Sequence, residues 1–130
     1  MDSVRHFELP VDDMQRAEAF YAAAFGWTSM APPGMEGQYE LVTTAEAGES
    51  HQPAGPGRVN GALYLRASPD AGTLLSIEVD AIEEAIARVL AAGGEVALPV
   101  RDVTGYGYYA RVRDSEGNLL VLWQPTPEDD

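Results

Sequence analysis

The residues of this chain best suited to chemistry lie on two segments in which apolar and polar residues alternate. His6 and Glu8 are two residues apart on the first segment, and Glu78 lies on the second. Side chains two residues apart on a strand point to the same face of a sheet. An imidazole beside a carboxylate can act as a general base or contribute to a metal site, so these three are the candidate catalytic residues. A lone histidine is also often a buried, hydrogen-bonded structural residue.

The two segments belong to a sequence repeat. Laying residues 6–27 over residues 74–95 pairs a Val-Asp step and a glycine of one copy with those of the other, without a gap. The same pairing places Leu74 over His6 and keeps Glu78 on the matching face. Because strand, helix start and helix stop all coincide, we interpret the chain as a duplicated unit.

The first copy reads as a strand, a helix and three further strands. Alternation predicts a strand over 4–11, and Asp12 is predicted to cap a helix over 13–25, with Gln15 completing a capping box and Gly26 ending the helix. Strands are then predicted over 27–30, 39–43 and 59–67, with a Gly- and Pro-rich loop over 44–57.

The second copy repeats this order. Its first strand begins at Leu74, Asp80 is predicted to cap the helix with Glu83 at the third helical position, and Gly93 follows the helix. Strands are predicted over 95–100, 106–113 and 119–124, with a turn over 114–118.

This pattern predicts the α+β class, with each helix on one face of a mainly antiparallel sheet. We expect a single domain over 1–130, built from one βαβββ module over 1–67 and a second over 73–124. The face of each sheet away from its helix is then free to form a binding surface.

Composition narrows the function further. The net charge of −13 opposes binding to a phosphate backbone, so we expect no nucleic-acid partner. The same charge would raise the local concentration of a cationic ligand. The chain has no cysteine and no segment typical of a signal peptide or membrane span, which favours a cytoplasmic protein without a membrane partner.

The order and spacing of four segments resemble the vicinal oxygen chelate superfamily, which includes glyoxalase I, bleomycin resistance proteins and extradiol dioxygenases. The segments are HFELPVDD, AEAFYAAAFGW, IEVDAIEEAIARVLAAGG and DSEGNLLVLWQP. In the last of them Ser115 replaces the proline that is usual in the family's turn. The resemblance implies the glyoxalase/bleomycin resistance/dihydroxybiphenyl dioxygenase-like fold, sheets that enclose a cup, a homodimer, and in the enzymes a divalent metal that activates the substrate.

The resemblance also implies where that metal would be held, since the family takes one ligand from the first strand and one from the last strand of each module. His6 matches the first of these positions, whereas its counterpart Leu74 cannot bind a metal, and Val121 stands where the family has a glutamate. Residues 61–65 contain no acid, histidine or amide, and His51 lies in the long loop, where we expect it to be solvated. We therefore predict no metal cofactor, because catalytic zinc sites generally take three protein ligands.

Strand alternation predicts which side chains line the cup. They are His6, Glu8, Leu74, Ser76, Val121 and Trp123, joined by Gly61 and Leu63 from the last strand of the first module. Tyr106, Tyr108 and Tyr109 are candidates for stacking on a ligand, although alternating aromatic residues are also ordinary in strands. Such a mixed lining suits a small organic molecule.

Two functions remain open. The first is a metal-free protein that binds a small organic molecule in the manner of bleomycin resistance proteins. The alternative is an enzyme, either a metal-dependent lyase or dioxygenase with a non-standard site around His6, or a metal-free catalyst with His6 as base. A purely structural domain, whose own side chains fill the cup, is a third possibility. The ligand positions favour the first.

Overall fold

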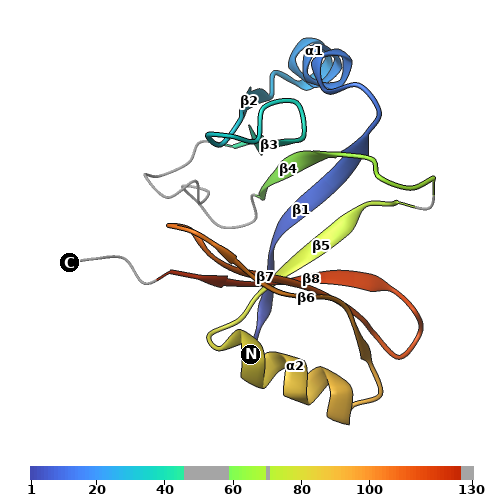
Figure 1. The fold of residues 1–130 in the computed structure, drawn as a ribbon. Coiled ribbons are helices and arrows are strands. Elements are labelled where there is room, and N and C mark those ends of the chain that lie inside the picture. The colour runs from blue at the N-terminus through green and yellow to red at the C-terminus, as the bar shows by residue number, and fades with distance from the viewer. Residues whose placement is uncertain (46–58, 70, 127–130) are drawn as a thin grey trace. The chain divides into compact units, whose positions relative to one another are not determined.

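A computed structural model describes residues 1–45, 59–69 and 71–126 of the chain, which divides into two compact units (Figure 1). The first unit comprises His6–Thr73, and the second comprises Met1–Arg5 with Leu74–Asp130. Most of the predicted 44–57 loop, including His51, lies outside the described residues. That the two predicted modules make a single domain stays a prediction.

Each unit has the predicted order of one strand, one helix and three strands. The elements are β1 (Ser3–Val11), α1 (Met14–Phe25), β2 (Thr28–Met30), β3 (Tyr39–Thr43), β4 (Asn60–Leu65), β5 (Leu74–Glu78), α2 (Ile82–Ala91), β6 (Glu95–Val103), β7 (Gly107–Arg113) and β8 (Leu119–Pro125). The predicted α+β class and the duplicated βαβββ pattern are confirmed. Strand and helix ends differ from the predicted ones by a few residues, most at β4, which is shorter, and at β6, which is longer.

In the first unit, the strands follow the order β2, β3, β4, β1. β3 runs antiparallel to β2 and β4, and β4 runs parallel to β1. One face packs against α1, where the buried side chains of Val11, Met14, Val42 and Leu63 form the core, with Phe7 at its margin. The predicted apolar side of the first strand is thus the side covered by the helix.

The first helix begins one residue later than predicted. Asp13, not Asp12, is the N-cap, and its Oδ1 accepts a hydrogen bond from the backbone N–H of Arg16 at 3.0 Å. Gly26 ends the helix in the left-handed conformation (φ 75°), as predicted. The capping role predicted for Asp12 is wrong because its side chain pairs with Arg66 instead.

In the second unit, the strands follow the order β5, β8, β7, β6, with β5 parallel to β8 and the other pairs antiparallel. α2 runs along β6, β7 and β8 (Figure 1). The core between helix and sheet contains the buried side chains Val79, Ile82, Ala85, Ala110, Val112 and Leu122.

The second helix is also capped differently from the prediction. Its N-cap is Ala81, which makes no side-chain capping bond. The backbone N–H of Ile82 instead donates to Oε1 of Gln124 at 2.8 Å, so a residue of β8 serves the helix terminus. The capping role predicted for Asp80 is therefore wrong. Among the described residues, no helix is long and apolar enough to cross a membrane.

Candidate functional site

Each unit has a sheet face turned away from its helix, which we call its helix-distal face. In the first unit, strand register defines this face, because Phe7 pairs with Gly61 and Leu9 with Leu63 on the α1 side. The alternate residues therefore share the helix-distal face. They are His6, Glu8 and Pro10 of β1 and Asn60, Ala62 and Tyr64 of β4.

Gly61 and Leu63 do not lie on the face predicted for them. Leu63 is completely buried among the core residues beneath α1, and a Cβ on Gly61 would come within 2.5 Å of the Phe7 ring. The predicted orientation is wrong because the parity of β4 is set by its pairing with β1, and a shift of one residue exchanges the two faces of a strand.

Asn60 is a residue of this face that the sequence analysis did not select. It is 1% exposed and aligned with His6 across the β1/β4 pair. Its Oδ1 accepts hydrogen bonds from the backbone N–H groups of Thr44 at 2.8 Å and Ala45 at 3.0 Å. Its Nδ2 is buried and donates to no described acceptor. The sequence feature that could have indicated Asn60 is its position as an amide residue at the start of the predicted strand.

Glu8 follows two residues after His6 on the same face, as predicted, and only 1% of it is exposed. A carboxyl group withdrawn from water to this extent makes hydrogen bonds or ionic contacts within the protein, and Glu8 does so. His6 also has interactions of its own within the protein. The candidate base His6 and the carboxyl group of Glu8 thus lie close together on one strand.

In the second unit, the helix-distal face combines apolar, aromatic and charged side chains. By register, Ser76, Val121 and Arg111 form one row across β5, β8 and β7, and Glu78, Trp123 and Tyr109 form the next. Leu74 belongs to the same face of β5 and is 2% exposed. The structure therefore places Leu74, Ser76, Val121 and Trp123, which were predicted by strand alternation, on one face.

Arg111 and Tyr109 are the polar centre of this face. Nε of Arg111 donates to the Tyr109 hydroxyl at 2.9 Å, and its guanidinium carbon lies 5.6 Å from the centre of the Tyr109 ring. Both contacts restrict the guanidinium to one orientation. Tyr109 is a stacking candidate predicted from the sequence, whereas no sequence pattern indicated Arg111.

Tyr106 and Tyr108 are not part of this arrangement. Tyr108 is aligned with Gln124, whose side chain reaches α2, so it lies on the opposite side of β7 from Tyr109 and is 40% exposed. Tyr106 precedes β7 and is 53% exposed. Adjacent strand residues point to opposite faces, so Tyr108 does not share the face of Tyr109. The stacking roles of the three tyrosines stay predictions.

The fold places the family's four metal-ligand positions on identified residues. Repeat alignment and register together make Ala62 of β4 the counterpart of Val121 of β8, since Glu8 is aligned with the first and Ser76 with the second. The four positions thus hold His6, Ala62, Leu74 and Val121. One imidazole and three hydrocarbon side chains do not fit a divalent metal. No group of three or more His, Cys, Asp or Glu side chains that could hold a metal occurs within the described ranges.

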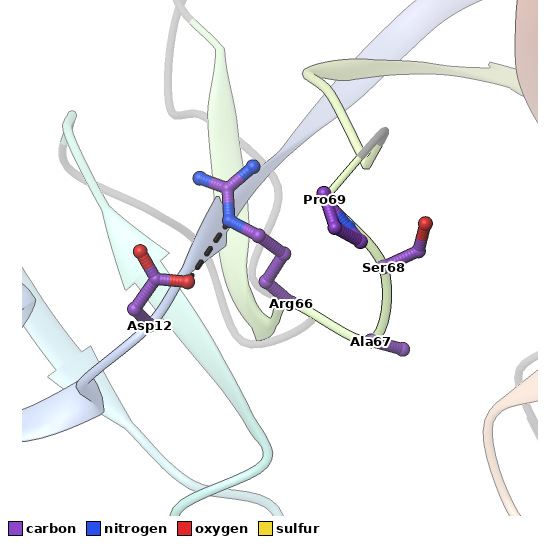
Figure 2. A pocket seen from close by; sticks show the side chains of 5 residues that line it. All are labelled: Asp12, Arg66, Ala67, Ser68 and Pro69. Carbon is purple, nitrogen blue, oxygen red and sulfur yellow. Dashed lines mark hydrogen bonds and ion pairs between the residues drawn. The ribbon is translucent and has the colours of Figure 1, made fainter.

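A separate hollow of about 400 Å³ lies at the end of β4, lined by Asp12, Arg66, Ala67, Ser68 and Pro69 (Figure 2). Nε of Arg66 pairs with Asp12 at 3.0 Å, as the dashed line in Figure 2 marks, and its Nη1 donates to the backbone oxygen of Ala71 at 2.7 Å. The guanidinium is thus occupied by its own chain. The contacts of Arg66 therefore connect the end of β4 with the segment before α1.

Comparison with known proteins agrees with this geometry. The glyoxalase/bleomycin resistance protein/dioxygenase superfamily model matches residues 3–122. A Mycobacterium tuberculosis protein named "Putative glyoxylase CFP32" is 29% identical over 120 residues, which cover 90% of this chain and 43% of the relative. The Streptomyces peucetius anthracycline biosynthesis protein DnrV is 29% identical over 130 residues, which cover 91% of this chain and 45% of that protein. The chain thus spans less than half the length of these curated relatives.

Solved structures show the same fold at low sequence identity. Methylmalonyl-CoA epimerase from Mycobacterium tuberculosis matches with a TM-score of 0.66 and 16% identity, over 95% of this chain and 88% of that one. The Mn(II)-bound glyoxalase from Novosphingobium aromaticivorans matches with a TM-score of 0.62 and 20% identity, over 100% of this chain and 43% of that one. From the family match and the duplicated βαβββ pattern, the chain belongs to the glyoxalase/bleomycin resistance protein/dioxygenase superfamily.

Proposed function

We propose that the chain binds a small organic molecule on a helix-distal face, without the divalent metal used by the enzymes of its family. The observation that carries this proposal is the identity of the four ligand positions, of which only His6 has a side chain able to bind a metal. The cores beneath α1 and α2 contain none of the residues at these four positions, so packing of the two cores does not depend on a metal there.

The side chains of the second unit support binding of an organic molecule. Trp123 and Tyr109 are aligned neighbours that offer aromatic contact, and Val121 is an apolar neighbour between Ser76 and Arg111. A mainly apolar surface with a few fixed polar groups is typical of small-molecule sites. The net charge of −13 favours a neutral or cationic guest over an anionic one.

One relative is named for anthracycline biosynthesis and another is named "Putative glyoxylase CFP32", and these two names support a small organic ligand. The homodimer and the cytoplasmic location expected from the sequence also remain proposals. Light scattering of the purified chain tests the first, and fractionation of the producing cells tests the second.

The second candidate function is a metal-dependent or metal-free enzyme with His6 at its centre. It is favoured by one observation, the buried carboxyl group of Glu8 on the same face two residues away. Glu78 is the third candidate catalytic residue. By register it is a neighbour of Trp123 in the second unit.

Elemental analysis of untagged protein purified without chelators separates the metal-free binding protein from a metal-dependent enzyme. Our proposal expects no stoichiometric zinc, nickel, manganese or iron, both as purified and after metal titration. Near-stoichiometric metal that is lost in His6→Ala would overturn it in favour of the enzyme.

Binding itself is tested by thermal shift with a panel of neutral and cationic aromatic compounds. A ligand that binds only the folded state raises the melting temperature. Tyr109→Ala should abolish the shift, whereas Tyr108→Ala on the opposite side of the same strand should retain it. Equal responses of the two variants would contradict binding at this face.

A further inference from the structure

Asn60 contains a hydrogen-bond donor with no acceptor among the residues that the structure describes. The residue is 1% exposed, and Nδ2 has no partner among the described residues. The orientation of the amide is fixed, because exchanging its nitrogen and oxygen would place an NH₂ group against the backbone N–H groups of Thr44 and Ala45. Nδ2 is therefore a buried donor without an acceptor in the described ranges of the chain.

Asn60 lies on the helix-distal face of the first unit. Asn60 and His6 are aligned on adjacent parallel strands, and such strands lie about 4.8 Å apart. Glu8 and Ala62 form the next aligned pair on the same face. The donor thus belongs to the part of the first unit that carries the single remaining family ligand position.

Buried donors without partners are rare in folded proteins, because the group loses its water on folding and gains nothing in return. Such an atom is explained when an acceptor arrives from outside the chain. The acidic character of the protein favours one kind of acceptor, since the net charge is −13. A negative net charge disfavours a carboxylate or phosphate relative to an uncharged oxygen.

We infer that Nδ2 of Asn60 donates a hydrogen bond to an uncharged acceptor oxygen, such as a carbonyl, of the molecule bound beside His6. This inference rests on the proposed function and deepens it, because it names the chemical class of the ligand and a residue that selects it. The site would bind ligands with an acceptor oxygen more tightly than ligands without one, because the latter would leave the buried donor unpaired.

Nuclear magnetic resonance of the ¹⁵N-labelled full chain tests this inference directly. Asn60 and Asn118 are the asparagines of the sequence, and Nδ2 of Asn118 already donates to Asp114 at 2.9 Å, so it serves as an internal reference. The probes are acetophenone, benzoate and toluene, which have similar shapes and differ in having a neutral acceptor, a charged acceptor or none. Acetophenone should shift the Asn60 side-chain amide signals while those of Asn118 stay in place, and benzoate and toluene should shift them much less.

The outcomes separate this inference from the proposed function. If acetophenone shifts backbone signals of β1 and β4 but not the Asn60 side-chain amide, binding stands and the inference is overturned. If no probe shifts any signal, both are overturned for this class of ligand. A contact between the Asn60 amide and a long-lived water that persists at saturating acetophenone also overturns the inference.

A variant supplies the second measurement. Asn60→Asp keeps an oxygen that can accept from Thr44 and Ala45 and replaces the donor, so acetophenone should bind about tenfold more weakly, the loss of one ordinary hydrogen bond. Asn118→Asp makes the same chemical change in the turn between β7 and β8 and should leave the affinity unchanged. Equal affinities of Asn60→Asp and the parent chain would overturn the inference.

Discussion

Nε of Arg66 lies 3.0 Å from Oδ1 of Asp12, so the carboxylate that follows β1 pairs with the residue that follows β4. The backbone N–H of Arg66 also donates to the oxygen of Val11 at 2.7 Å. The ends of the parallel strands β1 and β4 are therefore joined by an ion pair and a backbone hydrogen bond. The helix that follows β1 is capped by the next residue, Asp13.

The first prediction concerns this division of roles between two adjacent aspartates. Asp13→Ala should lower the free energy of unfolding by about 1 kcal/mol, because the Arg16 N–H loses its acceptor. Asp12→Ala should cost less, at most about 1 kcal/mol, since the pair with Arg66 is 67% exposed on the Asp12 side. Urea denaturation of both variants measures the difference, and a larger effect for Asp12 would refute the assignment of the cap.

The second prediction concerns the start of α2. Gln124→Leu should destabilise the chain by about 1 kcal/mol, because the buried N–H of Ile82 loses its acceptor. Asp80→Ala, which removes the residue predicted as cap, should change stability by no more than about 0.5 kcal/mol. Thermal unfolding compares the pair, and the reverse order would restore Asp80 as the cap.

The third prediction concerns the close approach of β4 and β1. Gly61→Ala should destabilise by about 1–3 kcal/mol, because the new methyl group would overlap the Phe7 ring, which packs at 6.0 Å from Trp27 and cannot withdraw freely. Gly72→Ala is the matched control, since a Cβ there meets nothing within 4 Å. Chemical denaturation should show a near-neutral control, and equal effects would place Gly61 outside the core.

The fourth prediction concerns pH. In the turn between β7 and β8, hydrogen bonds from the Asn118 side chain, then from backbone N–H groups of Asn118, Glu116 and Gly117, hold the pKa of Asp114 below its usual value of 3.8. A lowered pKa means that the ionised form stabilises the folded state. That contribution is complete above pH 3.8 and is lost as the pH falls through the folded-state pKa.

Carbon-13 detection of the Asp114 carboxyl during an acid titration measures this pKa. The Asn118→Ala variant should move it back toward the usual value, because it removes the largest cause of the shift. An unchanged Asp114 pKa in the variant would show that the backbone donors alone lower it.

The elements of the fold follow from local patterns. Alternation identified β1 and β5, helical periodicity identified α1 and α2, and Gly26 marked a helix end that the structure has at the same residue. Helix starts depend on tertiary contacts, because Asp12 and Asp13 have equal capping chemistry and only the position of Arg66 distinguishes them. The start of α2 likewise depends on a glutamine from β8, which supplies the acceptor in place of Asp80.

The sequence by itself determined the duplicated βαβββ pattern, the parity of β1, β5 and β8, and the loss of three of the four family ligand positions. Those features depend on side-chain type and on spacing along one strand. The tertiary structure decided which face of β4 is which, and so removed Gly61 and Leu63 from the candidate site and added Asn60. It likewise placed Tyr109 and Arg111 together on the helix-distal face and Tyr108 on the other face of β7. The physical reason is that the facing of a strand depends on its register with a neighbour distant in sequence, and a shift of one residue reverses every side chain.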